Sequence, residues 1–96
     1  MPSEIERIRQ AIRAQRYRIS AHANEEMSDD TLEALDIEEI ILTGIIALRY
    51  THDPRGTRYE VTGITRDGRR AAVVCRFLTS GILLIITAYT HEEDTL

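Results

Sequence analysis

The sequence predicts an α+β fold in which N-terminal helices precede a four-stranded antiparallel meander sheet. Three observations support this prediction. Before Gly44, apolar residues recur at helical spacing behind two capping-box patterns. After Gly44, apolar and polar residues alternate with the period of two that is typical of strands. The alternating segments are separated by short turn sequences, which join antiparallel strands and leave no room for crossover helices. We therefore expect the helices to cover one face or one end of the sheet.

Capping patterns and breaks in periodicity define the helices. The predicted helices cover residues 3–15, 21–31 and 37–43. Capping boxes open the first helix at Ser3 and the third at Asp36, and Ser20 is a plausible cap for the second. Gly44 follows the third helix, where a helix C-terminus favours a residue with positive φ. The short segment 17–20 can form either a brief strand or an extended connector.

Turn residues delimit the strands. The predicted strands cover residues 45–52, 58–65, 70–79 and 82–89. The turn between the first two contains Asp53-Pro54-Arg55-Gly56, with proline at the favoured second position and glycine at the fourth. Asp67-Gly68 and Ser80-Gly81 are typical of tight hairpins. The run 82–86 is apolar on both faces, so we expect the last strand to lie in the middle of the sheet.

Length and composition predict a single domain. The chain has 96 residues, with an expected core over about 3–90 and an acidic tail over 91–96. One cysteine, Cys75, excludes an internal disulfide, and its position within a strand favours an inert core thiol. The sequence contains no long apolar run and no secretory pattern at its start. We therefore expect a cytoplasmic protein without membrane contact.

Charge is unevenly distributed along the chain. The net charge is −4, but residues 1–44 hold five arginines and ten carboxylates, a balance of −5. Residues 45–90 hold seven arginines and three carboxylates, a balance of +4, and the tail contributes −3. This asymmetry suggests a basic, anion-binding face on an otherwise acidic protein. The alternative is that the strand arginines only solvate the outer face of the sheet.

The sequence lacks the standard catalytic and cofactor-binding motifs. It has no phosphate-binding loop, dinucleotide fingerprint, metalloprotease helix or nucleophile elbow. His22, His52 and His91 lack metal-ligand spacing, so we expect neither a metal nor a cofactor. His22 opens a predicted helix directly after the segment 17–20. It either fixes the start of that helix or serves as a general acid or base near neutral pH.

Arginines on neighbouring predicted strands form a candidate anion-binding surface. Arg58 and Arg76 are expected to project from the same face of adjacent antiparallel strands, and Arg49 could join them. Tyr89 and His91 end the last strand beside this region. Such a cluster supplies the minimal groups for metal-independent RNA cleavage, which needs a base, an acid and a cation for the phosphorane. The alternative is a solvent-facing sheet whose arginines form salt bridges with nearby acids.

Several segments, in order and at similar spacing, resemble a bacterial family called domain of unknown function forty-two fifty-eight. The resemblance spans residues 17–90 and rests on Ile19-Ser20-Ala21-His22-Ala23 with Met27, on Asp36-Ile37-Glu38-Glu39-Ile40-Ile41 leading to Gly44, on Arg58-Tyr59 with Gly63, and on Ile85-Ile86-Thr87-Ala88-Tyr89. One departure is Glu26, which stands before Met27 where the family usually has arginine.

The resemblance implies a RelE/ParE-like fold, because that family is thought to resemble these bacterial toxins. Many RelE-like toxins cut mRNA, often on the ribosome, without a metal. The resemblance carries the family's histidine onto His22, its strand arginine onto Arg58, and its final Thr-x-Tyr onto Thr87 and Tyr89. Together with the residue patterns, it predicts catalytic roles for His22, Arg58 and Tyr89. RNA contacts are expected from Arg49, Arg58, Arg76, Thr87 and His91.

Two functions remain open at this point. The first is a RelE-like RNA-binding protein that acts as an mRNA endonuclease toxin, with RNA, including ribosome-bound mRNA, and an antitoxin as partners. The alternative is a non-catalytic module for protein or RNA contact on the same fold. A homodimer formed through an exposed sheet edge is a further expectation.

Overall fold

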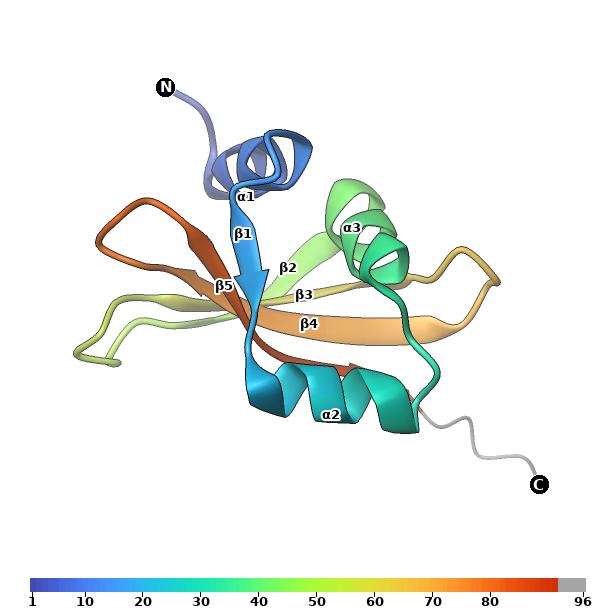
Figure 1. Cartoon of the computed structure of the whole chain (residues 1–96). Helices are drawn as coiled ribbons and strands as arrows, with labels where there is room; N and C mark the ends of the chain where they lie inside the picture. Colours follow the sequence, from blue (N-terminus) through green and yellow to red (C-terminus); the bar gives the residue numbers. More distant parts are fainter. Residues whose placement is uncertain (92–96) are drawn as a thin grey trace.

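Within residues 1–91, which the computed structural model describes, the chain forms three helices and one five-stranded sheet (Figure 1). The elements are α1 (Glu4–Arg13), β1 (Tyr17–Ile19), α2 (Ala21–Asp29), α3 (Ala34–Thr43), β2 (Ile45–Tyr50), β3 (Arg58–Ile64), β4 (Arg70–Phe77) and β5 (Leu83–Thr90). The predicted α+β class is confirmed. Of the acidic tail predicted over 91–96, all but His91 lies outside the described residues.

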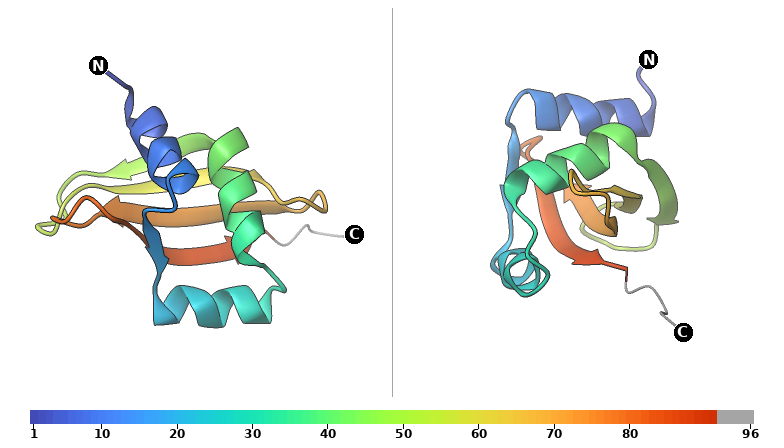
Figure 2. Two further views of the ribbon diagram at one scale, coloured as in Figure 1. Left: turned by 45° about the horizontal axis from the view of Figure 1, so that its top comes forward. Right: turned by 90° about the vertical axis from the view of Figure 1, so that its right-hand side faces the viewer.

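The helices lie on one face and at one edge of the sheet. Figure 2 shows α1 and α3 lying across the same face, whereas α2 runs beside β5. Within residues 1–91, the other face carries no helix (Figure 2), and all three helices precede β2 in the chain. The strands that follow are joined by turns. This arrangement leaves one face of the sheet open to ligands.

The sheet is mixed and has five strands, so the prediction of four antiparallel strands is wrong in part. Strands β2 to β5 do form an antiparallel meander, and β1 joins it in parallel beside β5. Tyr17 pairs with Leu83 and Ile19 with Ile85. Strand β5, predicted to lie in the middle of the sheet, has neighbours on both sides, but the middle strand is β4. Three residues of β1 give too short an alternation to be distinguished from a connector.

Helix α2 begins as predicted but ends earlier, at Asp29. The Ser20 hydroxyl accepts a hydrogen bond from Ala23 N at 3.0 Å and donates one to Ile86 O at 3.0 Å, which ties the helix start to β5. At the other end, Thr31 adopts φ +53°, and Leu32 N donates to Met27 O at 2.7 Å. This is a Schellman ending, in which the left-handed residue turns the chain out of the helix.

Helix α3 and Gly44 depart from the prediction. The helix begins at Ala34 with Glu33 as its N-cap, and Asp36 Oδ2 accepts a hydrogen bond from Glu33 N at 2.9 Å. Asp36 is thus the third helical residue rather than the cap. Gly44 has φ −87°, not a positive angle. A Cβ at Gly44 would collide with the carbonyl oxygens of Thr62 and Ile40, so glycine is required by the close approach of α3 to β3.

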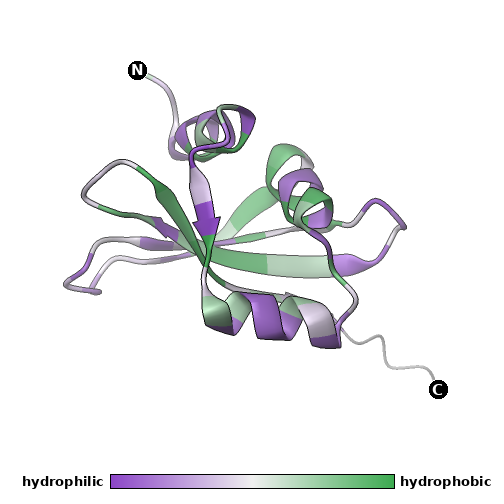
Figure 3. Ribbon diagram, in the orientation of Figure 1, coloured by the Kyte–Doolittle hydropathy of each residue, from purple (hydrophilic) through white to green (hydrophobic). Residues whose placement is uncertain are grey.

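The core between the helices and the sheet is aliphatic. Its largest fully buried side chains are Ile8, Ile12, Ile37, Ile40, Ile41, Val61, Val73, Cys75, Leu83 and Ile85. Figure 3 shows apolar residues concentrated in the strands and in α3, while the loops are largely polar. Burial raises the pKa of the Cys75 thiol to about 12, so the thiol stays protonated at neutral pH.

Candidate functional site

The open face of the sheet, opposite α1 and α3, carries most of the candidate residues. Tyr59 and Val61 of β3 point into the core, so the intervening residues of that strand point the other way. The same alternation applies to β4, where Val73 and Cys75 are buried in the core. The polar side chains that share the open face include Arg58, Glu60, Arg76, Thr87 and Tyr89.

Three arginines form a row across four adjacent strands of the open face, which we call the arginine row. The pairing of Tyr59 with Cys75 sets Arg58 of β3 beside Arg76 of β4. Arg76 pairs with Leu84 of β5, and Leu84 pairs with Arg18 of β1. Three strand spacings of about 4.8 Å separate Arg58 from Arg18, a span of about 14 Å. Arg18 was not among the predicted site residues, because β1 was not assigned as a strand.

The arginine row contains unused donors. The Nε atoms of Arg58 and Arg76 are both buried, and neither has a hydrogen-bond partner in the described structure. The Asp53 carboxylate balances the charge of Arg58, with Oδ2 at 3.2 Å from Nε. The two groups are not oriented for a hydrogen bond. Among residues 1–91, neither Arg76 nor Arg18 forms an ion pair. Buried donors without partners are uncommon in folded proteins, and adjacent guanidinium groups favour a bound anion.

Two tyrosines flank the arginines on the open face. The guanidinium of Arg58 stacks over the ring of Tyr50, 4.8 Å from its centroid. The Tyr89 hydroxyl donates a hydrogen bond to Glu60 Oε1 at 3.1 Å. Burial, together with the negative charge of Glu60, raises the pKa of Tyr89. At neutral pH the phenol therefore keeps its proton, so it can donate a proton or hydrogen bond but does not act as a base.

His22 reaches the edge of the open face through Glu26. Its side chain is 67% exposed, and its Nε2 lies 3.3 Å from Glu26 Oε1. The same carboxylate oxygen accepts hydrogen bonds from Thr87 Oγ1 at 2.8 Å and from Ala88 N at 3.2 Å. The open face and His22 are thereby connected by one chain of polar contacts. Glu26, at the position where the resembled family usually has arginine, has a structural role that the sequence did not predict.

Two carboxylates, one on α2 and one at its C-cap, lie along the edge of β5 beyond the end of β1. Glu26 accepts from Ala88 N, and Asp30 Oδ2 accepts from Thr90 N at 2.8 Å. Residues four apart on a helix rise about 6.0 Å, and residues two apart on a strand rise about 6.8 Å, so the two spacings nearly match. The helix thus supplies acceptors to strand N–H groups that would otherwise be unpaired.

Arg49 and His91 are not part of the arginine row. Arg49 pairs in register with the core residue Tyr59, and its Nε binds Glu4 Oε1 of α1 at 2.6 Å on the helix-covered side. It shares with Arg58 only a cavity of about 610 Å³ at the β2–β3 turn. His91 lies toward the opposite end of the sheet, with its ring 5.7 Å from that of Tyr89. The predicted grouping of Arg49 with Arg58 and Arg76 on one surface is therefore wrong.

Neither a metal centre nor a membrane-spanning helix is found in the described part of the chain. Residues 1–91 contain no group of three or more histidine, cysteine or acidic side chains arranged to hold a metal ion. None of the helices in this range has the length and apolar character needed to cross a bilayer.

Comparison with known proteins identifies a family. Residues 19–90 match the family described as Domain of unknown function (DUF4258). The match covers α2, α3, the whole antiparallel meander and the end of β1, and it therefore includes most of the open face. Neither the curated proteins nor the solved structures yield a match. Because the matched segment spans well over half of the sequence, the chain belongs to the family Domain of unknown function (DUF4258).

Proposed function

We propose that this chain is a RelE-like RNA-binding protein that holds RNA on the open face of its sheet. The observation that carries the proposal is the arginine row, in which Arg58 and Arg76 lie side by side and, among residues 1–91, Arg76 and Arg18 form no ion pair. Planar guanidinium groups hold phosphate oxygens in pairs of hydrogen bonds. An antiparallel meander with helices on one face supports the likeness to RelE-like toxins.

Single-stranded RNA fits this surface better than a duplex. Tyr50 and Tyr89 lie on the open face with the arginines, and aromatic side chains recognise unpaired bases by stacking. Arg58 already stacks on one face of the Tyr50 ring, leaving a cation beside the place that a base would take. Phosphate contacts along the row would hold the backbone, and the two rings would contact the bases.

The same surface supports a proposal of metal-independent RNA cleavage. A base would remove the proton of a ribose 2′-hydroxyl, the 2′-oxygen would attack phosphorus, and the bond to the 5′-oxygen would break. The leaving oxygen then needs a proton, and Tyr89 is a suitable donor because its raised pKa keeps it protonated. Arg58 and Arg76 would stabilise the phosphorane charge. Glu60 on this face and His22 beside its edge are the candidate bases.

Binding without cleavage is the second candidate function. The observation that favours it is the position of His22, which is exposed on α2 and reaches the sheet only through Glu26. In addition, Tyr89 donates a hydrogen bond to Glu60, so both groups are less available to a substrate. On this candidate, the arginine row would hold RNA and no strand would be broken.

A toxin of this kind would need an antitoxin, and the outer strand β2 is the surface we propose for it. In the part of the chain that the structure describes, one edge of β2 has no neighbouring strand, and Ile45, Leu48 and Tyr50 of this strand are exposed. Open edges of this kind pair with strands of other chains. A second copy of the chain could use the same edge, and light scattering at high concentration would detect that homodimer.

Primer extension on mRNA in a cell-free translation reaction tests the proposal. A cleaving protein gives new 5′ ends that disappear with Arg58→Ala and with Tyr89→Phe. Arg13→Gln is the matched control, because Arg13 lies on the exposed side of α1 and contacts only Glu6. Intact mRNA together with salt-sensitive RNA binding would establish the non-catalytic candidate. Absence of RNA binding even at low salt would refute both.

A further inference from the structure

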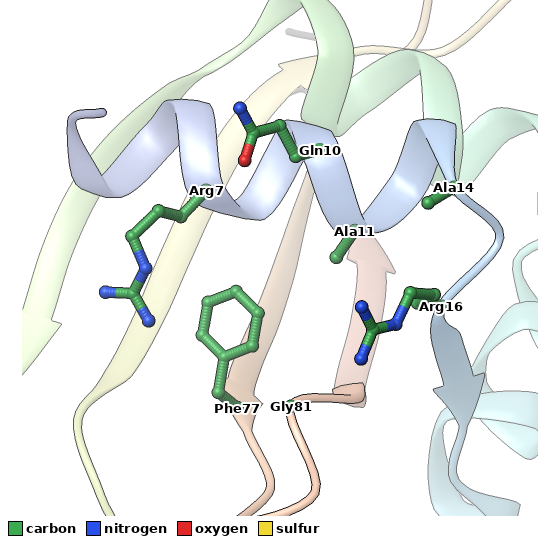
Figure 4. A pocket seen from close by; sticks show the side chains of 7 residues that line it. All are labelled: Arg7, Gln10, Ala11, Ala14, Arg16, Phe77 and Gly81. Atoms are coloured by element: carbon green, nitrogen blue, oxygen red, sulfur yellow. The ribbon is translucent and has the colours of Figure 1, made fainter. Parts of the chain in front are cut away.

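A cavity of about 270 Å³ lies between α1 and the turn that joins β4 to β5 (Figure 4). We call it the α1 pocket. Its polar lining consists of Arg7 and Gln10 of α1 and Arg16, which precedes β1. Phe77 and Gly81 line it from the hairpin. The pocket faces the helix-covered side of the sheet, away from the arginine row, so the inference below does not rest on the proposed function.

The backbone fixes the position of Arg16 firmly. Gln15 has φ +58°, and Arg16 N donates to Ala11 O at 2.8 Å in a Schellman ending of α1. On the other side, Arg16 O accepts from Leu83 N at 3.0 Å. A Cβ at Gly81 would lie 3.3 Å from Arg16 Nη2, so the absence of a side chain there leaves room for the guanidinium. The backbone of Arg16 is thus fixed beside the pocket, and its side chain is part of the lining.

Arg7 approaches from the opposite wall. Its guanidinium carbon lies 4.8 Å from the centroid of the Phe77 ring, in a cation–π contact. In Figure 4 the two guanidinium groups lie on either side of this ring. Neither Arg7 nor Arg16 forms an ion pair with any carboxylate of residues 1–91, whereas Arg9 and Arg13 of α1 both pair with Glu6.

Within residues 1–91, the lining therefore presents two arginines without ion pairs, one amide and one aromatic ring, and no acidic side chain. We propose that the α1 pocket binds a phosphate monoester, with Arg7 and Arg16 on either side of Phe77 contributing the positive charge. A dianionic phosphate has enough oxygens to accept hydrogen bonds from both guanidinium groups. The cavity volume of about 270 Å³ lies just below the range for small-molecule sites, about 300–1,000 Å³, so it suits a phosphate with only part of an attached nucleoside.

NMR titration of the ¹⁵N-labelled full chain tests this proposal. The probes are inorganic phosphate, adenosine monophosphate, and a short RNA with either a 5′-phosphate or a 5′-hydroxyl. We expect saturable shifts of the Arg16, Phe77 and Gly81 amides with the phosphorylated probes. A stronger response to the mononucleotide identifies a free nucleotide as ligand, and a stronger response to the 5′-phosphorylated RNA identifies an RNA end.

Substitutions separate a built site from general charge attraction. Arg16→Gln should weaken binding about tenfold or more, since it removes charge-assisted hydrogen bonds. Arg16→Lys keeps the charge and should weaken binding less. Arg13→Gln on the same helix should leave the affinity unchanged. Equal shifts with sodium chloride, or equal binding by the folded double variant Arg7→Gln/Arg16→Gln, would overturn the assignment.

Discussion

Replacing Arg76 by glutamine should weaken RNA binding and flatten its dependence on salt. Each phosphate contact to a single strand contributes about −0.7 to the slope of log affinity against log salt concentration. Three contacts from the arginine row give a slope of about −2.1, so affinity should fall about 18-fold between 50 and 200 mM salt. With two contacts left, the slope is about −1.4 and the fall is about 7-fold.

The fold should tolerate this substitution. Arg76 Nε is buried without a partner, so removing it relieves an unsatisfied donor. Loss of the packing of its aliphatic stem acts in the opposite direction. We therefore expect the free energy of unfolding to change by less than about 1 kcal/mol. Urea denaturation of both proteins verifies that any loss of binding is not a loss of folded protein.

Fluorescence anisotropy with a labelled single-stranded RNA measures the two slopes. Arg13→Gln removes the same charge from α1, distant from the open face, and should keep the slope of the unmodified chain. Equal slopes for Arg76→Gln and the unmodified chain would refute the arginine row as a phosphate-binding surface. An equal effect of Arg13→Gln would show that net charge, rather than the row, determines affinity.

Three further predictions concern the fold. Gly44→Ala should lower the free energy of unfolding by about 3 kcal/mol, because its Cβ would overlap the Thr62 carbonyl; an unchanged urea midpoint would contradict this. Thr31→Gly should raise stability by less than about 1 kcal/mol, because relief of the observed φ of +53° outweighs loss of the exposed hydrogen bond that Thr31 Oγ1 accepts from Arg69; calorimetry showing a lower Tm would contradict it. Burial alone would raise the pKa of Asp36, but hydrogen bonds from backbone N–H groups and from Arg66 outweigh it, so its pKa is lowered on folding. The resulting stabilisation is present above about pH 4 and is lost as pH falls through the folded pKa; Asp36→Asn should abolish this part of the acid-unfolding curve, and an unaltered curve would count against the ion pair.

Local patterns predicted the helices and the antiparallel meander, but they did not predict that β1 joins the sheet in parallel beside β5. Strand β1 has three residues, and its partner β5 lies more than sixty residues away. A segment that short has no reliable period of its own, and its pairing depends on contacts formed only in the folded chain. Because the sequence does not show that residues 17–19 pair with β5, it does not place Arg18 in the arginine row.

Two bulges determine which face of the sheet several of the site residues occupy, against simple alternation. The register between β2 and β3 shifts between Ile46 and Leu48, which turns Arg49 to the helix side. Without that bulge, simple alternation would have set Arg49 opposite Arg58 on the open face. A second shift opposite Val74 and Cys75 turns Thr87 and Tyr89 onto the open face. Neither bulge has a glycine or another marker in the strand sequence.

Glycine is required at position 44, but not for the reason that the sequence pattern indicated. A glycine after a helix favours the expectation of positive φ, and many helices do end in that way. Here the constraint comes from β3, because Gly44 and Gly63 let the two backbones approach; a Cβ at Gly63 would lie 2.8 Å from Ile40 O. Such a contact joins segments distant in sequence, so the local pattern around the helix end cannot contain it.

The side-chain Nε–Hε signals of the arginines test the central claim most directly. If RNA lies along the arginine row, titration with a short single-stranded RNA at low salt should shift the signals of Arg18, Arg58 and Arg76 together. The signal of Arg13 should stay in place. Binding that leaves Arg18 and Arg76 unshifted, or that shifts arginines elsewhere instead, would contradict an RNA site on the open face of the sheet.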